Sequence, residues 1–242
     1  MANCGKACFG LLIVIGLASV SALLYMAIRG EFKSTLETKR INRLIVLLGD
    51  NNNNDRNDDS WLKISKQYAG FFASAEQLDI ELAHSTSINP MDRLERVAAM
   101  LNLTRWYDGT EPVLLPLAGY QGLMNTLASW LSAEGLPQPD DDNDDASTPE
   151  HAGTTVKQFS LIATTQSYID RMLTALGVTQ SPDVAEKRAD VVAFEVWPGD
   201  GVKLRAVDKN AQLLDSFASL GAVQTVLCPK TSQDDDECKF AE

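Results

Sequence analysis

The chain has 242 residues, is 45% hydrophobic and carries a net charge of −12 at neutral pH. This acidity argues against nucleic acid and anionic membrane surfaces as partners, because phosphate-rich surfaces repel a negatively charged protein. Residues 43–242 are long enough for one domain with its own hydrophobic core. The chain contains two histidines, and neither has a cysteine or histidine at metal-ligand spacing, so we expect no metal ion and no cofactor.

The first predicted element is a long apolar segment over residues 7–28. It follows a short tail, residues 1–6, contains no charged residue, and as a helix it spans roughly 33 Å, enough to cross a bilayer. Its length favours an uncleaved signal anchor. A cleavable signal peptide is the alternative, and in that case the protein is secreted.

Flanking residues give conflicting indications of the side on which the domain lies. Basic residues are more frequent after the apolar segment than before it, and the positive-inside rule then leaves the domain in the cytosol. A glycosylation sequon at Asn102 and a late cysteine pair, Cys228 and Cys238, instead suit an oxidising lumen or the cell exterior. The two cysteines can form a disulfide if their Cα atoms lie close enough, and a free Cys238 is the alternative.

After a charged stalk over 29–42, the hydrophobic pattern predicts alternating strands and helices. Residues 43–48 form a short apolar run typical of a buried strand, which ends at the polar tract 49–55. The further predicted strands cover 78–83, 113–117, 157–163, 191–197 and its hairpin partner 202–207. The predicted helices cover 61–75, 91–103, 120–133 and 167–176.

One stretch, residues 136–155, is rich in Pro, Asp, Asn, Ser and Gly and cannot pack into a core, so we expect a solvated acidic loop. Its carboxylates lack the turn glycine and closing glutamate of a calcium-binding loop. The remaining elements predict an α/β domain with a mixed, mainly parallel sheet. A ligand site is expected at the C-terminal ends of the parallel strands.

General catalytic motifs give no functional assignment. The sequence has no Walker phosphate-binding loop, no dinucleotide-binding glycine fingerprint, and no HExxH, CxxC or GxSxG motif. A functional hypothesis therefore depends on resemblance to a known family.

Short segments of the chain, in the same order, resemble the histidine acid phosphatases, the family that includes the lysosomal and prostatic acid phosphatases. Residues 193–197 read AFEVW and look like the family's strand ending in FELW, and 202–207 look like its next strand. The other similar segments are 67–72, 80–86, 91–103, 169–178, 215–226 as the closing helix, and 237–239 as the terminal EC segment. The resemblance implies a three-layer α/β fold, here with a reduced helical cap, and the cleavage of phosphomonoesters.

The first catalytic motif of that family is not retained. There, the first strand ends in Arg-His-Gly-Asp-Arg, whose histidine attacks phosphorus and whose arginines hold the phosphoryl oxygens. Gly49 and Asp50 match this motif, but Leu47 and Asn51 stand at the arginine positions and Leu48 stands at the nucleophile. A leucine has no lone pair with which to attack phosphorus.

The second catalytic motif is also lost. The His-Asp pair of the family aligns with Thr165 and Gln166, and glutamine is not a general acid. The arginine of the family's VRST strand aligns with His84. A protonated histidine retains some affinity for anions but cannot make the bidentate contact of an arginine, and a partly buried histidine at a strand end is the simpler interpretation.

These losses predict a catalytically inactive, acid-phosphatase-like protein of the secretory pathway or cell surface. It would act as a binding or structural module attached to the membrane through 7–28, and a homodimer is implied by the family alone. One alternative is an active phosphatase or other hydrolase with His84 or His151 as the base, and another is an unrelated anchored α/β domain. The alignment requires Leu48 and Thr165 to lie side by side at the ends of adjacent strands.

Overall fold

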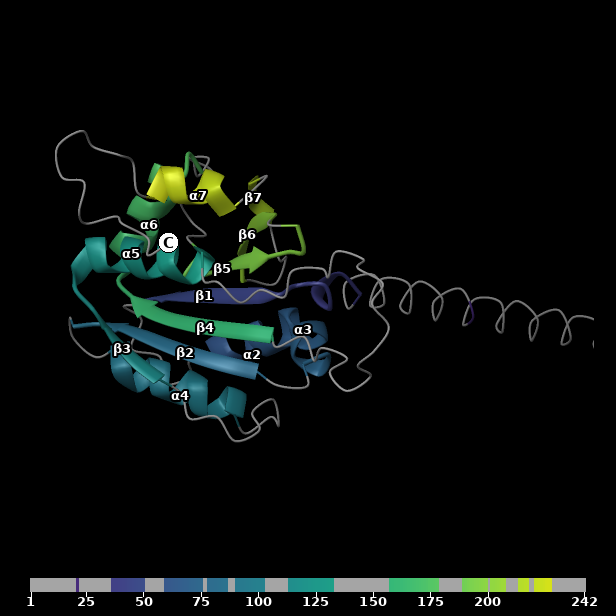
Figure 1. Ribbon diagram of the computed structural model, residues 1–242. Coiled ribbons are helices and arrows are strands. Elements are labelled where there is room, and N and C mark those ends of the chain that lie inside the picture. The colour runs from purple at the N-terminus through teal and green to yellow at the C-terminus, as the bar shows by residue number, and fades with distance from the viewer. Residues whose placement is uncertain are drawn as a thin grey trace, which may run out of the picture.

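Seven strands form one mixed sheet in the computed structural model of the protein, in the order β3-β2-β4-β1-β5-β6-β7 (Figure 1). The strands are β1 (Arg43–Gly49), β2 (Leu78–Ser85), β3 (Val113–Leu117), β4 (Lys157–Thr164), β5 (Val191–Val196), β6 (Val202–Ala206) and β7 (Leu213–Phe217). The structure describes residues 21, 36–50, 59–75, 78–86, 90–102, 113–132, 157–178, 189–199, 201–207, 213–217 and 220–227.

The strands β3, β2, β4 and β1 are parallel neighbours, which confirms the expected α/β domain with a mixed sheet, and this sheet is mostly parallel in its core. From β1 onward each pairing is antiparallel: β5 pairs with β1, β6 with β5, and β7 with β6. The predicted hairpin of β5 and β6 is therefore present. Its turn includes Gly199, whose φ of 82° favours glycine.

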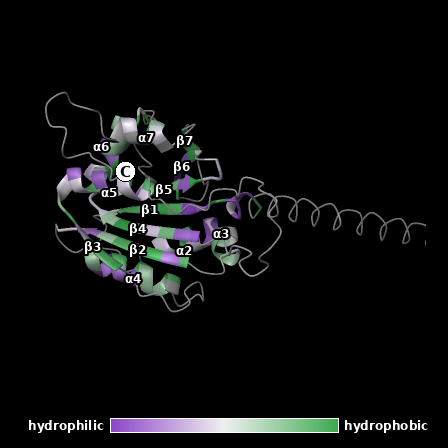
Figure 2. Ribbon diagram, viewed as in Figure 1, coloured by the Kyte–Doolittle hydropathy of each residue, from purple (hydrophilic) through white to green (hydrophobic). Residues whose placement is uncertain are grey.

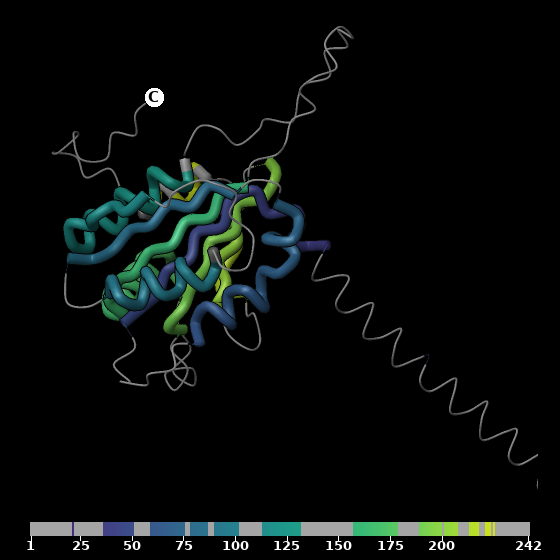
Figure 3. The backbone as a smooth tube through the Cα atoms, turned by 90° about the horizontal axis from the view of Figure 1, so that it is seen from below, coloured from purple at the N-terminus to yellow at the C-terminus, as the bar shows by residue number. Residues whose placement is uncertain are grey.

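Helices cover both faces of the sheet. One face carries α2 (Ser60–Gln67), α3 (Ala69–Ala73) and α4 (Pro90–Asn102), which lie in front of the strands in the view from below (Figure 3). The other face carries α5 (Gly119–Ser132), α6 (Gln166–Ala175) and α7 (Leu220–Leu227). Two hydrophobic cores result, one on each side of the sheet.

The central strand β1 is buried along its whole length, and most of it is hydrophobic in Figure 2. Alternate side chains point to opposite faces of a strand. Leu44, Val46 and Leu48 therefore join the core under α2–α4, whereas Ile45 and Leu47 join the core under α5–α7. Burial on both faces explains why this strand is a continuous apolar run rather than an alternating one.

Two predicted helices differ from the structure. The helix expected over 61–75 is broken at Tyr68 into α2 and α3. The single closing helix expected over 215–226 is wrong in its first part, because Leu213–Phe217 forms the edge strand β7 and the helix begins at Leu220. The free edge of β6 offers backbone hydrogen-bond partners to the segment before the helix, and such tertiary pairing overrides local helical propensity.

Several predicted features lie outside the described residues: most of segment 7–28, Asn51, the acidic loop 136–155, His151, Cys228 and Cys238. Within the described parts of the chain, no helix is long and apolar enough to span a membrane. The same parts contain no group of three or more His, Cys, Asp or Glu side chains that could hold a metal ion.

Candidate functional site

The C-terminal ends of β1, β4 and β2 bring together three of the positions selected from the sequence. Leu48 of β1 pairs with Ala163 of β4, and Thr165 follows β4 directly. On the other side of β4, His84 of β2 also pairs with Ala163. Leu48, His84 and Thr165 thus lie at one edge of the sheet, where an α/β protein usually binds its ligand.

The two leucines at this edge are fully buried. Leu47 is 0% exposed and Leu48 is 1% exposed, and they point into the cores on opposite faces of the sheet. Neither side chain can therefore meet a molecule in solution. Their role is packing: leucines of this kind stabilise a core and offer no acid, base or nucleophile.

Asp50 places a carboxylate at the N-terminus of α6, where its Oδ1 accepts a hydrogen bond from the backbone N–H of Gln166. Exposed N–H groups and the helix dipole make a helix N-terminus attractive to anions. In this protein the anion is supplied by the chain itself. An incoming phosphate would have to displace Asp50 and overcome its negative charge.

Gly49 allows this close approach of α6 to the end of β1. A Cβ atom added at Gly49 would overlap Oε1 of Gln166 and would lie only 3.2 Å from the carbonyl oxygen of Asp190. The Gln166 amide is itself engaged, since its Nε2 donates to Asp170 Oδ1 at 3.0 Å and to the carbonyl oxygen of Ala189 at 3.2 Å. Gln166 therefore serves to fix the start of α6.

Thr165 precedes α6 in the N-cap position with extended backbone angles, but its side chain does not cap the helix. Its Oγ1 instead lies 2.9 Å from Oγ of Ser167. The carboxylate of Asp50 takes the capping role. Thr165 and Gln166, which align with a catalytic pair in the resembled family, thus make contacts that hold the local backbone.

Arg93 is a cation at this edge that the sequence analysis missed. It lies in the first turn of α4, and its Nη1 donates to the carbonyl oxygen of Gly49 while its Nη2 donates to Oγ of Ser60 at 2.5 Å. These bonds connect α4, the end of β1 and the start of α2. The signal was available, because a helix that follows a parallel strand begins at the C-terminal edge of the sheet.

His84 is partly buried, and its Nδ1 atom has no hydrogen-bond partner. Both His84 and Leu48 pair with the same residue of β4, Ala163, so their backbones are separated by two strand spacings, roughly 10 Å. The Nδ1 atom of His84 is therefore not held by a carboxylate or hydroxyl in the way that a catalytic imidazole usually is.

No protein-family model, curated protein or solved structure matches this chain.

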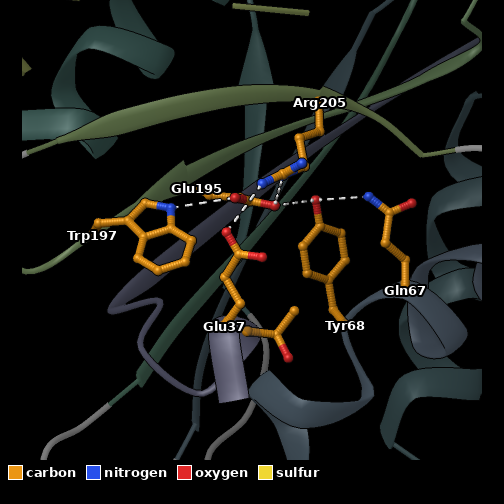
Figure 4. A pocket seen from close by; sticks show the side chains of 7 residues that line it. Glu37, Gln67, Tyr68, Glu195, Trp197 and Arg205 are labelled. Atoms are coloured by element: carbon orange, nitrogen blue, oxygen red, sulfur yellow. Dashed lines mark hydrogen bonds and ion pairs between the residues drawn. The ribbon is translucent and has the colours of Figure 1, made fainter. Parts of the chain in front are cut away.

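A second polar site lies near the opposite end of β1, between α2, β5 and β6 (Figure 4). At its centre the carboxylate of Glu195, only 2% exposed, accepts three hydrogen bonds or ion-pair contacts. Oε1 accepts the Tyr68 hydroxyl at 3.1 Å and pairs with Arg205 Nε at 2.8 Å, and Oε2 accepts Trp197 Nε1 at 3.2 Å. Each carboxylate oxygen is thus satisfied without a ligand.

This recess is too small for most substrates. It encloses about 100 Å³, whereas small-molecule sites typically have volumes of ~300–1,000 Å³. Burial, together with the negative charge of Glu195, raises the pKa of Tyr68 well above its ordinary value, so the phenol remains protonated and acts as a donor. The geometry indicates a structural network rather than a reaction centre.

Proposed function

We propose that this protein is a catalytically inactive, acid-phosphatase-like protein that acts as a binding or structural module in the secretory pathway or at the cell surface. One observation carries the proposal. At the sheet edge where a phosphate would bind, the nucleophile position is a buried leucine, Leu48, and the helix N-terminus is already occupied by the Asp50 carboxylate.

The arrangement of strands supports the alignment on which this proposal rests. The alignment requires Leu48 and Thr165 to stand at the ends of adjacent strands, and β1 and β4 are parallel neighbours with Gly49 paired to Thr164. His84, the third aligned position, is the penultimate residue of β2, which pairs with β4 on its other side. The same juxtaposition arises in any α/β sheet in which these strands are parallel neighbours, so it is consistent with the alignment without being specific to that family.

The chemistry at this edge also favours an inactive protein. The guanidinium of Arg93 donates to Gly49 and Ser60, so that two of its donors are already used. Asp50 adds a negative charge where phosphoryl oxygens would need positive charge. With glutamine at position 166, no general acid replaces the one expected from the family.

Hydrolysis of p-nitrophenyl phosphate by the full chain tests the proposal directly. We expect a rate equal to that of the buffer blank from acidic to neutral pH. The competing hypothesis, an active hydrolase with His84 as its base, has one observation in its favour, the unpartnered Nδ1 atom. Turnover that is lost in His84→Ala but kept in Glu95→Ala, a change at an exposed residue of α4, would overturn the proposal.

Binding of inorganic phosphate tests whether Asp50 occupies the anion position. By isothermal titration calorimetry we expect no binding to the unaltered chain and weak binding, with a Kd of about 1 mM, to Asp50→Ala. The matched control is Asp59→Ala, which removes the same charge from an exposed residue just before α2. Equal phosphate affinity in the unaltered chain and in Asp50→Ala would show that the carboxylate does not block the site.

The proposal includes a location in the lumen or outside the cell, with residues 7–28 as an anchor or as a signal peptide that is removed. The sequon residue Asn102 ends α4, at a helix terminus. On expression in a eukaryotic cell we expect a glycosidase-sensitive mass that Asn102→Gln removes, and alkaline extraction of membranes separates an anchored from a secreted form. A chain that carries no glycan and is digested by protease from the cytosolic side would contradict this location.

A further inference from the structure

The arm formed by residues 36–42, just before β1, is bound to the domain through its backbone. It begins with a helical turn over 36–38 and continues into the sheet at Asn42. The N–H of Asn42 donates to the carbonyl oxygen of Val196 on β5 at 2.9 Å, and its carbonyl oxygen accepts the N–H of Gln158 on β4 at 3.2 Å. The side chain of Ile41 is completely buried.

Lys157, the first residue of β4, binds the backbone of the arm. Its ammonium donates to the carbonyl oxygens of Lys39 at 2.7 Å and Ile41 at 2.9 Å, and it lies 4.9 Å from the centre of the Phe71 ring. The side chain is 7% exposed. Burying a lysine is unfavourable unless its donors are used, and here the arm supplies the acceptors.

A second set of contacts is made by the side chain of Glu37, which belongs to the arm itself. Its Oε1 accepts a hydrogen bond from Lys203 Nζ at 3.0 Å and lies 3.7 Å from Arg205 Nη2. Arg205 in turn pairs with the buried Glu195, so the arm is connected to the polar network seen in Figure 4. Lys203 also lies over the Trp197 ring at 3.9 Å, which fixes the cation that Glu37 meets.

The arm therefore contacts β4 and the hairpin of β5 and β6, which all lie more than 100 residues after it in the sequence. Both sets of contacts involve a charged group: Lys157 donates to two carbonyl oxygens of the arm, and the Glu37 carboxylate lies between two cations. All these contacts lie at the end of β1 opposite Leu48 and Gly49, and seven strand residues at about 3.3 Å each place the two ends roughly 20 Å apart.

We propose that residues 36–42 are a docked strap, which fixes the edge of the domain from which the N-terminal part of the chain departs. The last seven residues of the predicted stalk, 36–42, therefore belong to the folded domain and are not a free linker. The proposal is independent of the catalytic state of the protein. It depends only on contacts between described residues.

Limited trypsin digestion of the full chain tests the strap, because Lys39 and Arg40 provide cleavage sites within it. The reference is a free peptide with the sequence of residues 36–44. We expect cleavage after Arg40 to be at least about tenfold slower in the protein than in the peptide, because a site must open locally before a protease can cut it. Equal rates in the protein and the peptide would overturn the proposal.

Two variants test which contacts hold the strap. Glu37→Gln removes the charge that meets Lys203 and Arg205, and Lys157→Met removes the donor to the two carbonyl oxygens while keeping most of the side-chain volume. We expect faster cleavage after Arg40 in each variant and the fastest in the double variant. The matched controls, Glu95→Gln and Lys66→Met at exposed positions of α4 and α2, should leave the rate unchanged.

Hydrogen exchange in the unaltered chain tests the strap without any substitution, so its result does not depend on whether a variant folds. We expect the amide of Asn42, which donates to Val196, and the amide of Ile41, which donates to Thr38 at 3.3 Å, to exchange as slowly as neighbouring amides of β1. Exchange of both amides at the rate of an unstructured peptide would overturn the proposal. So would cleavage rates after Arg40 that neither variant changes.

Discussion

The two ends of the central strand β1 differ in the kind of residue that they bury. At its C-terminal end, where parallel sheets usually bind ligands, the side chains of Leu47 and Leu48 are buried in the two hydrophobic cores. Near its N-terminal end it is surrounded by buried charged groups, namely Arg43, Lys157 and Glu195. Figure 2 shows the same contrast, with hydrophilic colour at the N-terminal ends of β1, β2 and β4.

The buried charges near the N-terminal end differ in how completely they are paired. Arg43 is 1% exposed, and its Nη2 donates to Glu81 Oε2 at 2.9 Å, but its Nε and Nη1 atoms have no hydrogen-bond partner. Burial lowers the pKa of this guanidinium, against the opposing effect of Glu81. Such groups are unfavourable to bury, and they persist where their partners hold elements together.

The largest effect is expected from Glu195→Ala, which tests whether the charged end is a structural network. The change leaves Arg205 Nε, the Tyr68 hydroxyl and Trp197 Nε1 without their acceptor. We expect the free energy of unfolding to fall by about 3–5 kcal/mol, as for other broken buried ion pairs. Urea denaturation measures it, and Glu195→Gln, which keeps one acceptor, should lose less. A loss below about 1 kcal/mol would mean that the network contributes little.

The apolar end is tested by Leu48→Ala. If Leu48 is purely a core residue, its truncation should cost about 2–5 kcal/mol of unfolding free energy, within the range for buried leucines. Leu62→Ala is the control, because that leucine is 49% exposed and should change stability by less than about 0.5 kcal/mol. A neutral Leu48→Ala would indicate that this end of β1 is not packed and would reopen the question of a pocket there.

The smallest effect is expected for the pH dependence of stability caused by Lys157. Burial lowers the pKa of Lys157 from its ordinary value of 10.5 to about 8. Between these two values the folded protein has lost a proton that the unfolded chain still holds, so the free energy of unfolding rises with pH in this window. The rise is at most about 3.5 kcal/mol, since one pKa unit corresponds to about 1.4 kcal/mol.

The difference between the unaltered chain and Lys157→Met isolates this contribution from other titrating groups. One of them is Tyr68, whose raised pKa makes stability fall once the pH exceeds the ordinary value of 10 for an unfolded tyrosine. Thermal unfolding measured from pH 7 to pH 11 should show a pH-dependent difference between the two chains over the window of Lys157. Parallel stability curves would show that the lysine is not buried as described.

Sequence patterns predicted six of the seven strands and most helices because those elements carry their signal locally. The run from Arg43 to Leu48 could be assigned because a strand buried on both faces must be apolar throughout. The closing helix implied by the family resemblance is wrong at residues 215–217, which pair with β6. The helix predicted over 61–75 is wrong at Tyr68, where the break between α2 and α3 places the hydroxyl 3.1 Å from Glu195. Arg93 was missed because its partner, the carbonyl oxygen of Gly49, is a backbone atom from a distant part of the chain.

The sequence by itself determined that positions 47 and 48 cannot perform phosphoryl transfer, because the chemistry of a leucine is the same in any fold. Tertiary structure alone decided that Leu48, His84 and Thr165 share one edge, since the order of strands in a sheet depends on crossovers that no local pattern encodes. Tertiary structure also decided which group occupies the anion position at that edge. The carboxylate of Asp50 reaches the helix N-terminus of α6 across more than a hundred residues of sequence, and only folding could place it there.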